Sequence, residues 1–86
     1  MAIGGDLEQL TTLQTTFTRS SGQIEELVAT LTSQLGGVRW EGPAADRFRN
    51  MWASDFSPAL GRIREALDDA GTEVGRRRDA LEQAGS

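Results

Sequence analysis

Two long segments with a helical hydrophobic period, separated by a short connection, constrain this chain more than any other feature. Apolar residues recur at steps of three and four positions over residues 7–35 and again over residues 56–81. This spacing is typical of amphipathic helices that bury one face. The connection between them contains Trp40-Glu41-Gly42. The sequence therefore predicts an all-α fold, an antiparallel helix-turn-helix hairpin that forms one domain over residues 1–86.

Local signals set the expected ends of the two helices. Asp6 suits an N-cap, since its carboxylate can accept a backbone N–H of the first turn. Gly36-Gly37 is expected to supply the left-handed conformation that ends a helix. Pro43 suits the first turn of the next helix, where its missing N–H costs nothing. The expected elements are a first helix over about 6–35, a turn over 38–42 and a second helix over about 43–82.

Two features of the second segment conflict with a straight, regular helix. Pro58 lacks the N–H that would bond to the carbonyl of Ser54, so we expect a kink there or a short break near 55–57. Gly71 and Gly75 are four residues apart, which indicates either a close helix crossing or simple flexibility.

The apolar faces are wider than a single pair of helices can cover. A chain of 86 residues without cysteine has few other means of stabilising a small core. Pairing with a second hairpin gives a four-helix bundle, which would bury the excess. We therefore expect an obligate homodimer or heterodimer. The expected core and dimer seam consists of Leu10, Phe17, Ile24, Leu31, Phe48, Trp52, Ile63 and Leu67.

Charge and composition argue against several classes of function. The net charge is -4, which disfavours binding to nucleic acid or to an anionic membrane surface. Arg76-Arg77-Arg78 could form a phosphate site, but a solvated helix end, where cations favour the helix dipole, is the simpler interpretation. The chain has no histidine and no cysteine, so we expect no metal, no cofactor and no enzymatic activity.

No apolar run approaches the roughly 20 residues that span a bilayer. The first residues also lack the basic and apolar regions of a secretory signal peptide. If the protein leaves the cell, we expect it to use a route that does not read a cleavable leader.

The motif, its mid-chain position, the helical flanks and the length together resemble the WXG-motif family of type VII (ESX) secretion proteins. The residues that carry the likeness are Trp40-Glu41-Gly42 and, after the turn, Ala44-Ala45, Phe48 and Trp52. The resemblance implies a dimer of antiparallel hairpins that is exported as an effector or acts as a carrier for a partner. It implies a turn read by the secretion ATPase, a toxin or another partner, and a protein that is cytoplasmic before export and then secreted or at the cell surface.

One part of the family pattern is missing from this sequence. The family pairs its Trp-X-Gly turn with a Tyr-x-x-x-Asp/Glu signal at the end of the second helix, but this chain has no tyrosine. The signal could lie on a partner chain or on a further C-terminal tail, or this could be the targeting domain of a larger secreted toxin.

Other roles stay open at this point. The chain could be a cytosolic helical adaptor or chaperone that is never exported, or a helix that acts on membranes after dissociation. Trp40 itself could simply plug the end of the hairpin core, as large aromatic residues often do.

Overall fold

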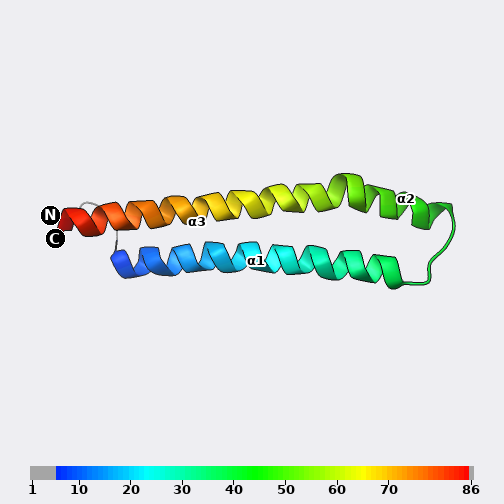
Figure 1. The fold of residues 1–86 in the computed structure, drawn as a ribbon, viewed down its shortest axis with the longest axis horizontal. Helices are drawn as coiled ribbons and strands as arrows, with labels where there is room; N and C mark the ends of the chain where they lie inside the picture. The colour runs from blue at the N-terminus through cyan, green and yellow to red at the C-terminus, as the bar shows by residue number, and fades with distance from the viewer. Residues whose placement is uncertain (1–5, 86) are drawn as a thin grey trace.

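A computed structural model describes residues 6–85 as a helical hairpin (Figure 1). Apart from Asp6 and the loop 38–42, every described residue is helical, so the predicted all-α fold is confirmed. The elements are α1 (Leu7–Gly37), α2 (Pro43–Met51), a π-helical turn η1 (Trp52–Phe56) and α3 (Ser57–Gly85).

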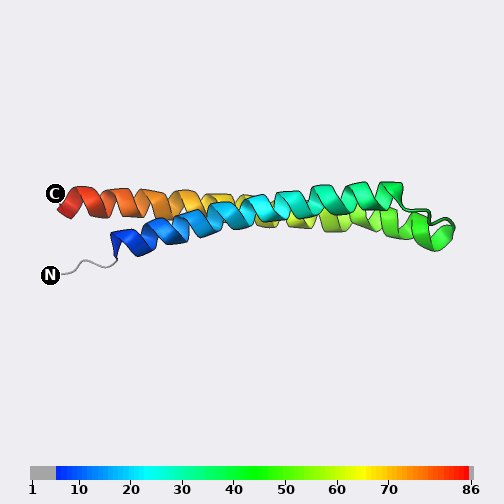
Figure 2. The ribbon, with the colours of Figure 1, turned by 90° about the horizontal axis from the view of Figure 1, so that it is seen from below.

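The two arms of the hairpin run antiparallel. The start of α1 and the end of α3 lie at the same end of the rod, and the loop closes the other end (Figure 1). Seen from below, the arms cross at a shallow angle (Figure 2). The molecule measures 65 × 17 × 14 Å, so its cross-section holds only two helices, each about 10 Å across.

Both ends of α1 are fixed by hydrogen bonds. The Asp6 carboxylate accepts from the backbone N–H groups of Glu8 and Gln9 at 2.9 and 3.2 Å, as expected of an N-cap. At the other end, the Val38 N–H donates to the Gln34 carbonyl at 2.9 Å while Val38 itself is extended.

The expectation that Gly36-Gly37 would supply a left-handed cap was wrong. Among the described residues, only Gly42 has a positive φ. The two glycines remain helical, and α1 runs two residues past the expected end to Gly37. The helix ends because the chain becomes extended at Val38, so no left-handed residue is needed there.

A π-helical turn precedes Pro58. The Ser57 N–H donates to the Trp52 carbonyl five residues back, in place of the usual four. Pro58 cannot donate to Ser54, and its ring would crowd that carbonyl in a regular α-helix. The wider turn accommodates the ring without interrupting the helix, so no break occurs at 55–57.

The seam between α1 and α3 is shallow. Six of the expected seam residues are half-buried in the hairpin, whereas Phe48 and Ile63 remain 39% and 49% exposed. No large side chain in the described part of the chain is fully buried, and Ala45 is its only buried hydrophobic residue. The half-buried members are Leu10, Phe17, Ile24, Leu31, Trp52 and Leu67.

Gly71 and Gly75 form a close helix crossing. Both are buried against α1. A Cβ atom at Gly71 would lie 3.3 Å from the Cβ of Phe17, and one at Gly75 would collide with the Gln14 amide. The alternative of simple flexibility is therefore wrong at Gly71, where the absent side chain allows α3 to approach the Phe17 Cβ; at Gly75 the contact is with the movable end of the Gln14 side chain.

Substituting Gly71 tests this close approach. We expect Gly71→Leu to force the helices apart and lower the free energy of unfolding by about 1–3 kcal/mol, the usual cost of overpacking. Urea denaturation followed by circular dichroism, at one fixed protein concentration, measures the change.

Gly22→Leu is the matched control, because a Cβ at Gly22 meets nothing within 4 Å. Leucine there should stabilise by about 1 kcal/mol through helix propensity alone. Equal effects from the two substitutions would contradict a tight crossing at Gly71.

Candidate functional site

The loop that contains Trp40-Glu41-Gly42 has a defined backbone. The Trp40 N–H donates to the Val38 carbonyl at 3.0 Å. Gly42 adopts φ 116° and ψ 173°, a region that is essentially restricted to glycine. Its carbonyl then accepts the Asp46 N–H at 3.0 Å, which starts α2, with Pro43 in the first turn. Gly42 is therefore required by the backbone of the turn.

The indole of Trp40 lies on the outside of the turn. Its ring centroid is 5.9 Å from that of Phe48 on α2, yet the residue remains 41% exposed. Phe48 in turn lies 6.2 Å from Phe56 in the π-helical turn. In the hairpin, Trp40 does not plug the core; it starts an exposed row of three aromatic rings.

Arg49 ties the loop to the end of α1. Its Nε donates to the Leu35 carbonyl at 3.0 Å, its Nη1 to the Trp40 carbonyl at 2.8 Å and its Nη2 to the Val38 carbonyl at 3.2 Å. The guanidinium carbon also lies 6.0 Å from the centre of the Trp40 ring, within range of a cation–π contact.

Sequence reasoning missed Arg49, although a signal for it exists. The last turn of α1 contains no basic residue. The carbonyls at a helix C-terminus lack partners and carry partial negative charge. A donor from outside the helix was therefore to be expected, and an arginine soon after the turn is well placed to be that donor.

Trp52 connects the π-helical turn to α1. Its Nε1–H donates to the Thr32 hydroxyl at 2.9 Å, and its ring lies 6.5 Å from that of Phe56. Phe48 and Trp52 are thus both part of the aromatic surroundings of the turn. Glu41 is exposed, and no hydrogen bond or ion pair joins it to another described residue.

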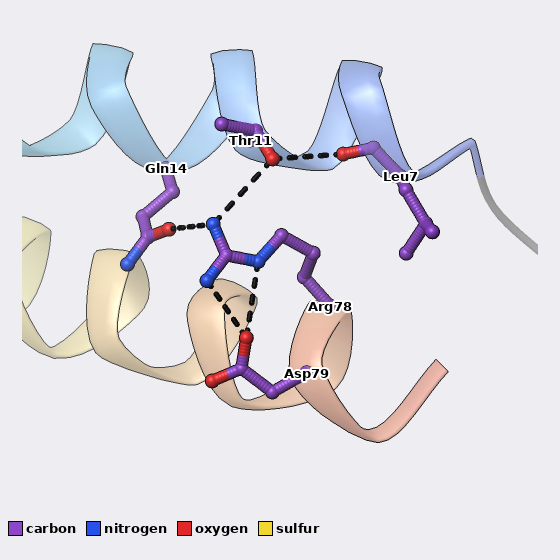
Figure 3. A network of polar contacts seen from close by, with 5 residues as sticks. All are labelled: Leu7, Thr11, Gln14, Arg78 and Asp79. Carbon is purple, nitrogen blue, oxygen red and sulfur yellow. Dashed lines mark hydrogen bonds and ion pairs between the residues drawn. The ribbon is translucent and has the colours of Figure 1, made fainter. Parts of the chain in front are cut away.

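The three consecutive arginines do not act as one cationic site. Arg76 and Arg77 both pair with Glu73, at 3.2 and 2.6 Å, on the solvated face of α3. Arg78 departs from the solvated helix end that the sequence favoured. It reaches across to α1, where its Nη1 donates to Thr11 and Gln14 at 3.4 and 3.2 Å (Figure 3).

Arg78 also pairs with the neighbouring carboxylate of Asp79 at 2.7 Å, as Figure 3 shows. Each guanidinium of the run therefore already has a carboxylate partner. The contacts of Arg78 hold the open end of the hairpin together and leave little free charge for a phosphate.

Comparison with known proteins assigns this hairpin to a protein family. The family model described as "Proteins of 100 residues with WXG" matches residues 3–86. The chain belongs to the WXG100 family. No curated protein and no solved structure gave a match. WXG100 proteins are small helical proteins associated with type VII secretion, and they are not known as enzymes.

The described part of this WXG100 hairpin contains neither a membrane-spanning helix nor a cluster of metal-binding side chains. None of the helices in the described part of the chain is both long and apolar enough to cross a membrane. Within residues 6–85, no cluster of three acidic, histidine or cysteine side chains is arranged to hold a metal ion.

The backbone of the turn makes Gly42 sensitive to substitution. We expect Gly42→Ala to lower the free energy of unfolding by about 1–3 kcal/mol, the cost of holding a side chain in that conformation. The midpoint of urea denaturation measures the shift.

Gly36→Ala provides the comparison, since Gly36 is helical and a Cβ added there meets nothing within 4 Å. Alanine there should stabilise by up to about 1 kcal/mol. A stability loss at Gly36 and none at Gly42 would reverse the assignment of the strained residue.

Proposed function

We propose that this WXG100 protein is a non-enzymatic helical dimer that is exported by the type VII (ESX) system or escorts a partner through it. The exposed turn is the observation that carries the proposal. Trp40 is 41% exposed, although it belongs to the motif that defines the family. A large aromatic side chain held outside a fixed turn is suited to recognition by another protein.

The dimer rests on the apolar surface that the hairpin leaves uncovered. Leu13 and Leu27 are 42% and 45% exposed and lie on one stripe of α1, two heptads apart. Phe56 at the end of η1 and Ile63 in α3 are one heptad apart and are 41% and 49% exposed. We name these four residues the apolar face. A second hairpin packed on this face would complete a four-helix bundle.

The charge pattern of α1 supports the same pairing. Glu25 pairs with Arg64 across one side of the seam at 3.9 Å, and helical spacing puts Leu27 on the other side. Within α1, the residues three, four or seven positions from Leu13 and Leu27 are all uncharged, either apolar or polar. Two acidic chains can thus approach there without opposing like charges. These polar residues are Gln9, Thr16, Ser20, Gln23, Thr30 and Gln34.

A charge placed on the apolar face should separate the dimer. We expect the unmodified chain to have twice its 9.3 kDa mass in light scattering after size exclusion. Ile63→Glu should shift it toward the monomer, because the carboxylate would lose its water in the interface.

Thr72→Glu adds the same charge at an exposed position of the same helix and should leave the mass unchanged. A monomeric mass for the unmodified chain would favour a heterodimer with a related WXG100 chain. That partner could also carry the tyrosine signal, since these 86 residues contain none.

Removing the indole should impair export with little effect on the fold. Trp40→Ala removes a ring that lies outside the seam, so we expect a folded dimer and a much smaller secreted fraction. Immunoblots of culture supernatant, with a cytosolic protein as lysis control, measure that fraction.

Normal export of folded Trp40→Ala would rule out recognition through the turn. Absence of the unmodified protein from the supernatant would instead support the alternative of a cytosolic adaptor or chaperone.

A further inference from the structure

We propose that Arg49 is a positioning residue that holds the Trp40 turn in the conformation a partner reads. The inference rests on the proposed function, because it gives Arg49 a role in the same recognition event. Its support is the set of contacts that this one side chain makes with the loop backbone and with the indole.

Both backbone groups of Trp40 are held. Its N–H donates to the Val38 carbonyl at 3.0 Å, and its carbonyl accepts from Arg49 Nη1 at 2.8 Å. The Val38 carbonyl that holds the N–H also accepts from Arg49 Nη2 at 3.2 Å. Two of the three carbonyls bound by Arg49 therefore belong to the hydrogen bonds that define the position of Trp40.

The third contact anchors the loop to a rigid element. Arg49 Nε donates to the carbonyl of Leu35, which lies in α1, while Arg49 itself lies in α2. The guanidinium therefore connects both helical arms and the loop between them. Without it, the loop backbone at Val38 and Trp40 would keep only the bond between these two residues and the bond from the Val38 N–H to the Gln34 carbonyl.

The indole is oriented by the same group. The guanidinium carbon of Arg49 lies 6.0 Å from the ring centre of Trp40, and the ring centre of Phe48 lies 5.9 Å from the same point. The two contacts come from adjacent residues of α2, so they limit rotation of a side chain that is otherwise exposed. Fixing an exposed aromatic side chain before binding lowers the entropy lost when a partner binds.

An arginine, and not simply a cation, is needed for this geometry. Nε, Nη1 and Nη2 each donate to a different carbonyl. The guanidinium presents these donors in a rigid planar fork, whereas the three donors of lysine share one nitrogen atom. Lysine could keep the charge near the end of α1 and near the indole, but it could not span all three carbonyls.

The test measures the order of the turn separately from export. NMR relaxation gives the order parameter of the Trp40 backbone amide, which we expect to be near 0.85 in the unmodified protein. In Arg49→Ala it should fall below about 0.6, the range of flexible backbone. If the turn then holds the conformation that binds the partner for only about a tenth of the time, partner binding weakens about tenfold. The secreted fraction is expected to fall with it.

Two further variants separate this role from a general effect on charge or folding. Arg47→Ala removes an exposed arginine of the same helix whose side chain has no hydrogen bond or ion pair with another described residue. It should change neither the order parameter nor export. Arg49→Lys keeps the charge and should fold even if Arg49→Ala does not, with intermediate values of both readouts.

The outcomes are distinct. An unchanged order parameter at Trp40 in a folded Arg49 variant overturns the inference. So does normal export of a variant whose turn has become flexible, provided that Trp40→Ala is export-defective. Normal export of Trp40→Ala would instead refute recognition through the turn, which is the part of the proposed function on which this inference rests, and it is measured on a different protein sample.

Discussion

The packing of α1 against α3 is the interaction on which the rest of the structure depends, and it is limited by geometry to one seam. Two helices side by side can each cover only one stripe of the other. The central seam residues are consequently half-buried, and none of the large side chains described is fully enclosed. The hairpin therefore has a well-defined shape but a poor core. This combination explains why a partner is expected to contribute to its stability.

The seam differs in character at its two ends. Toward the open end, glycines on α3 face Phe17 and Gln14 on α1, and the contacts beside them are polar, with Arg78 bonded to Gln14. Toward the loop, Arg49 bonds to the Leu35 carbonyl and the Trp52 indole bonds to the Thr32 hydroxyl of α1. The helices approach closely where side chains are small and are held by bulky groups and a guanidinium near the turn. The part of the molecule that presents Trp40 is thus built differently from the rod that carries it.

Much of the architecture could be predicted from the sequence, because it depends on periodicity. The spacing of apolar residues gave two antiparallel helices, and Asp6 behaved as an N-cap should. What could not be predicted depends on contacts between distant residues. The carbonyls that Arg49 would bind, and the side chains that Gly71 and Gly75 would meet, follow only from the pairing of the helices. Gln14 is a polar residue within the apolar stripe of α1, and it faces a glycine of α3 and bonds to Arg78.

The site shows the same division. The place of Gly42 in the connection, directly before Pro43, is evident from the sequence, whereas its positive φ is a finding of the structure. The position of the Trp40 indole, outside the core and against Phe48, depends on how the loop is held and was not evident from residue types. Phe48 and Ile63 fitted the heptad pattern as well as their neighbours did. Their exposure in the hairpin reflects their place at the edge of the stripe.

The π-helical turn also sets the rotation of one half of the second arm relative to the other. In an uninterrupted α-helix, Trp52 and Leu60 would point about 80° apart around the axis. The wider turn at Trp52–Phe56 removes most of that angle, so Trp52 bonds to Thr32 while Leu60 still faces the seam. The π-helical turn therefore sets the rotation of α2 about the helix axis relative to α3. Loss of a single residue there would rotate Arg49 and Trp52 away from their partners on α1 and leave the packing of α3 in register.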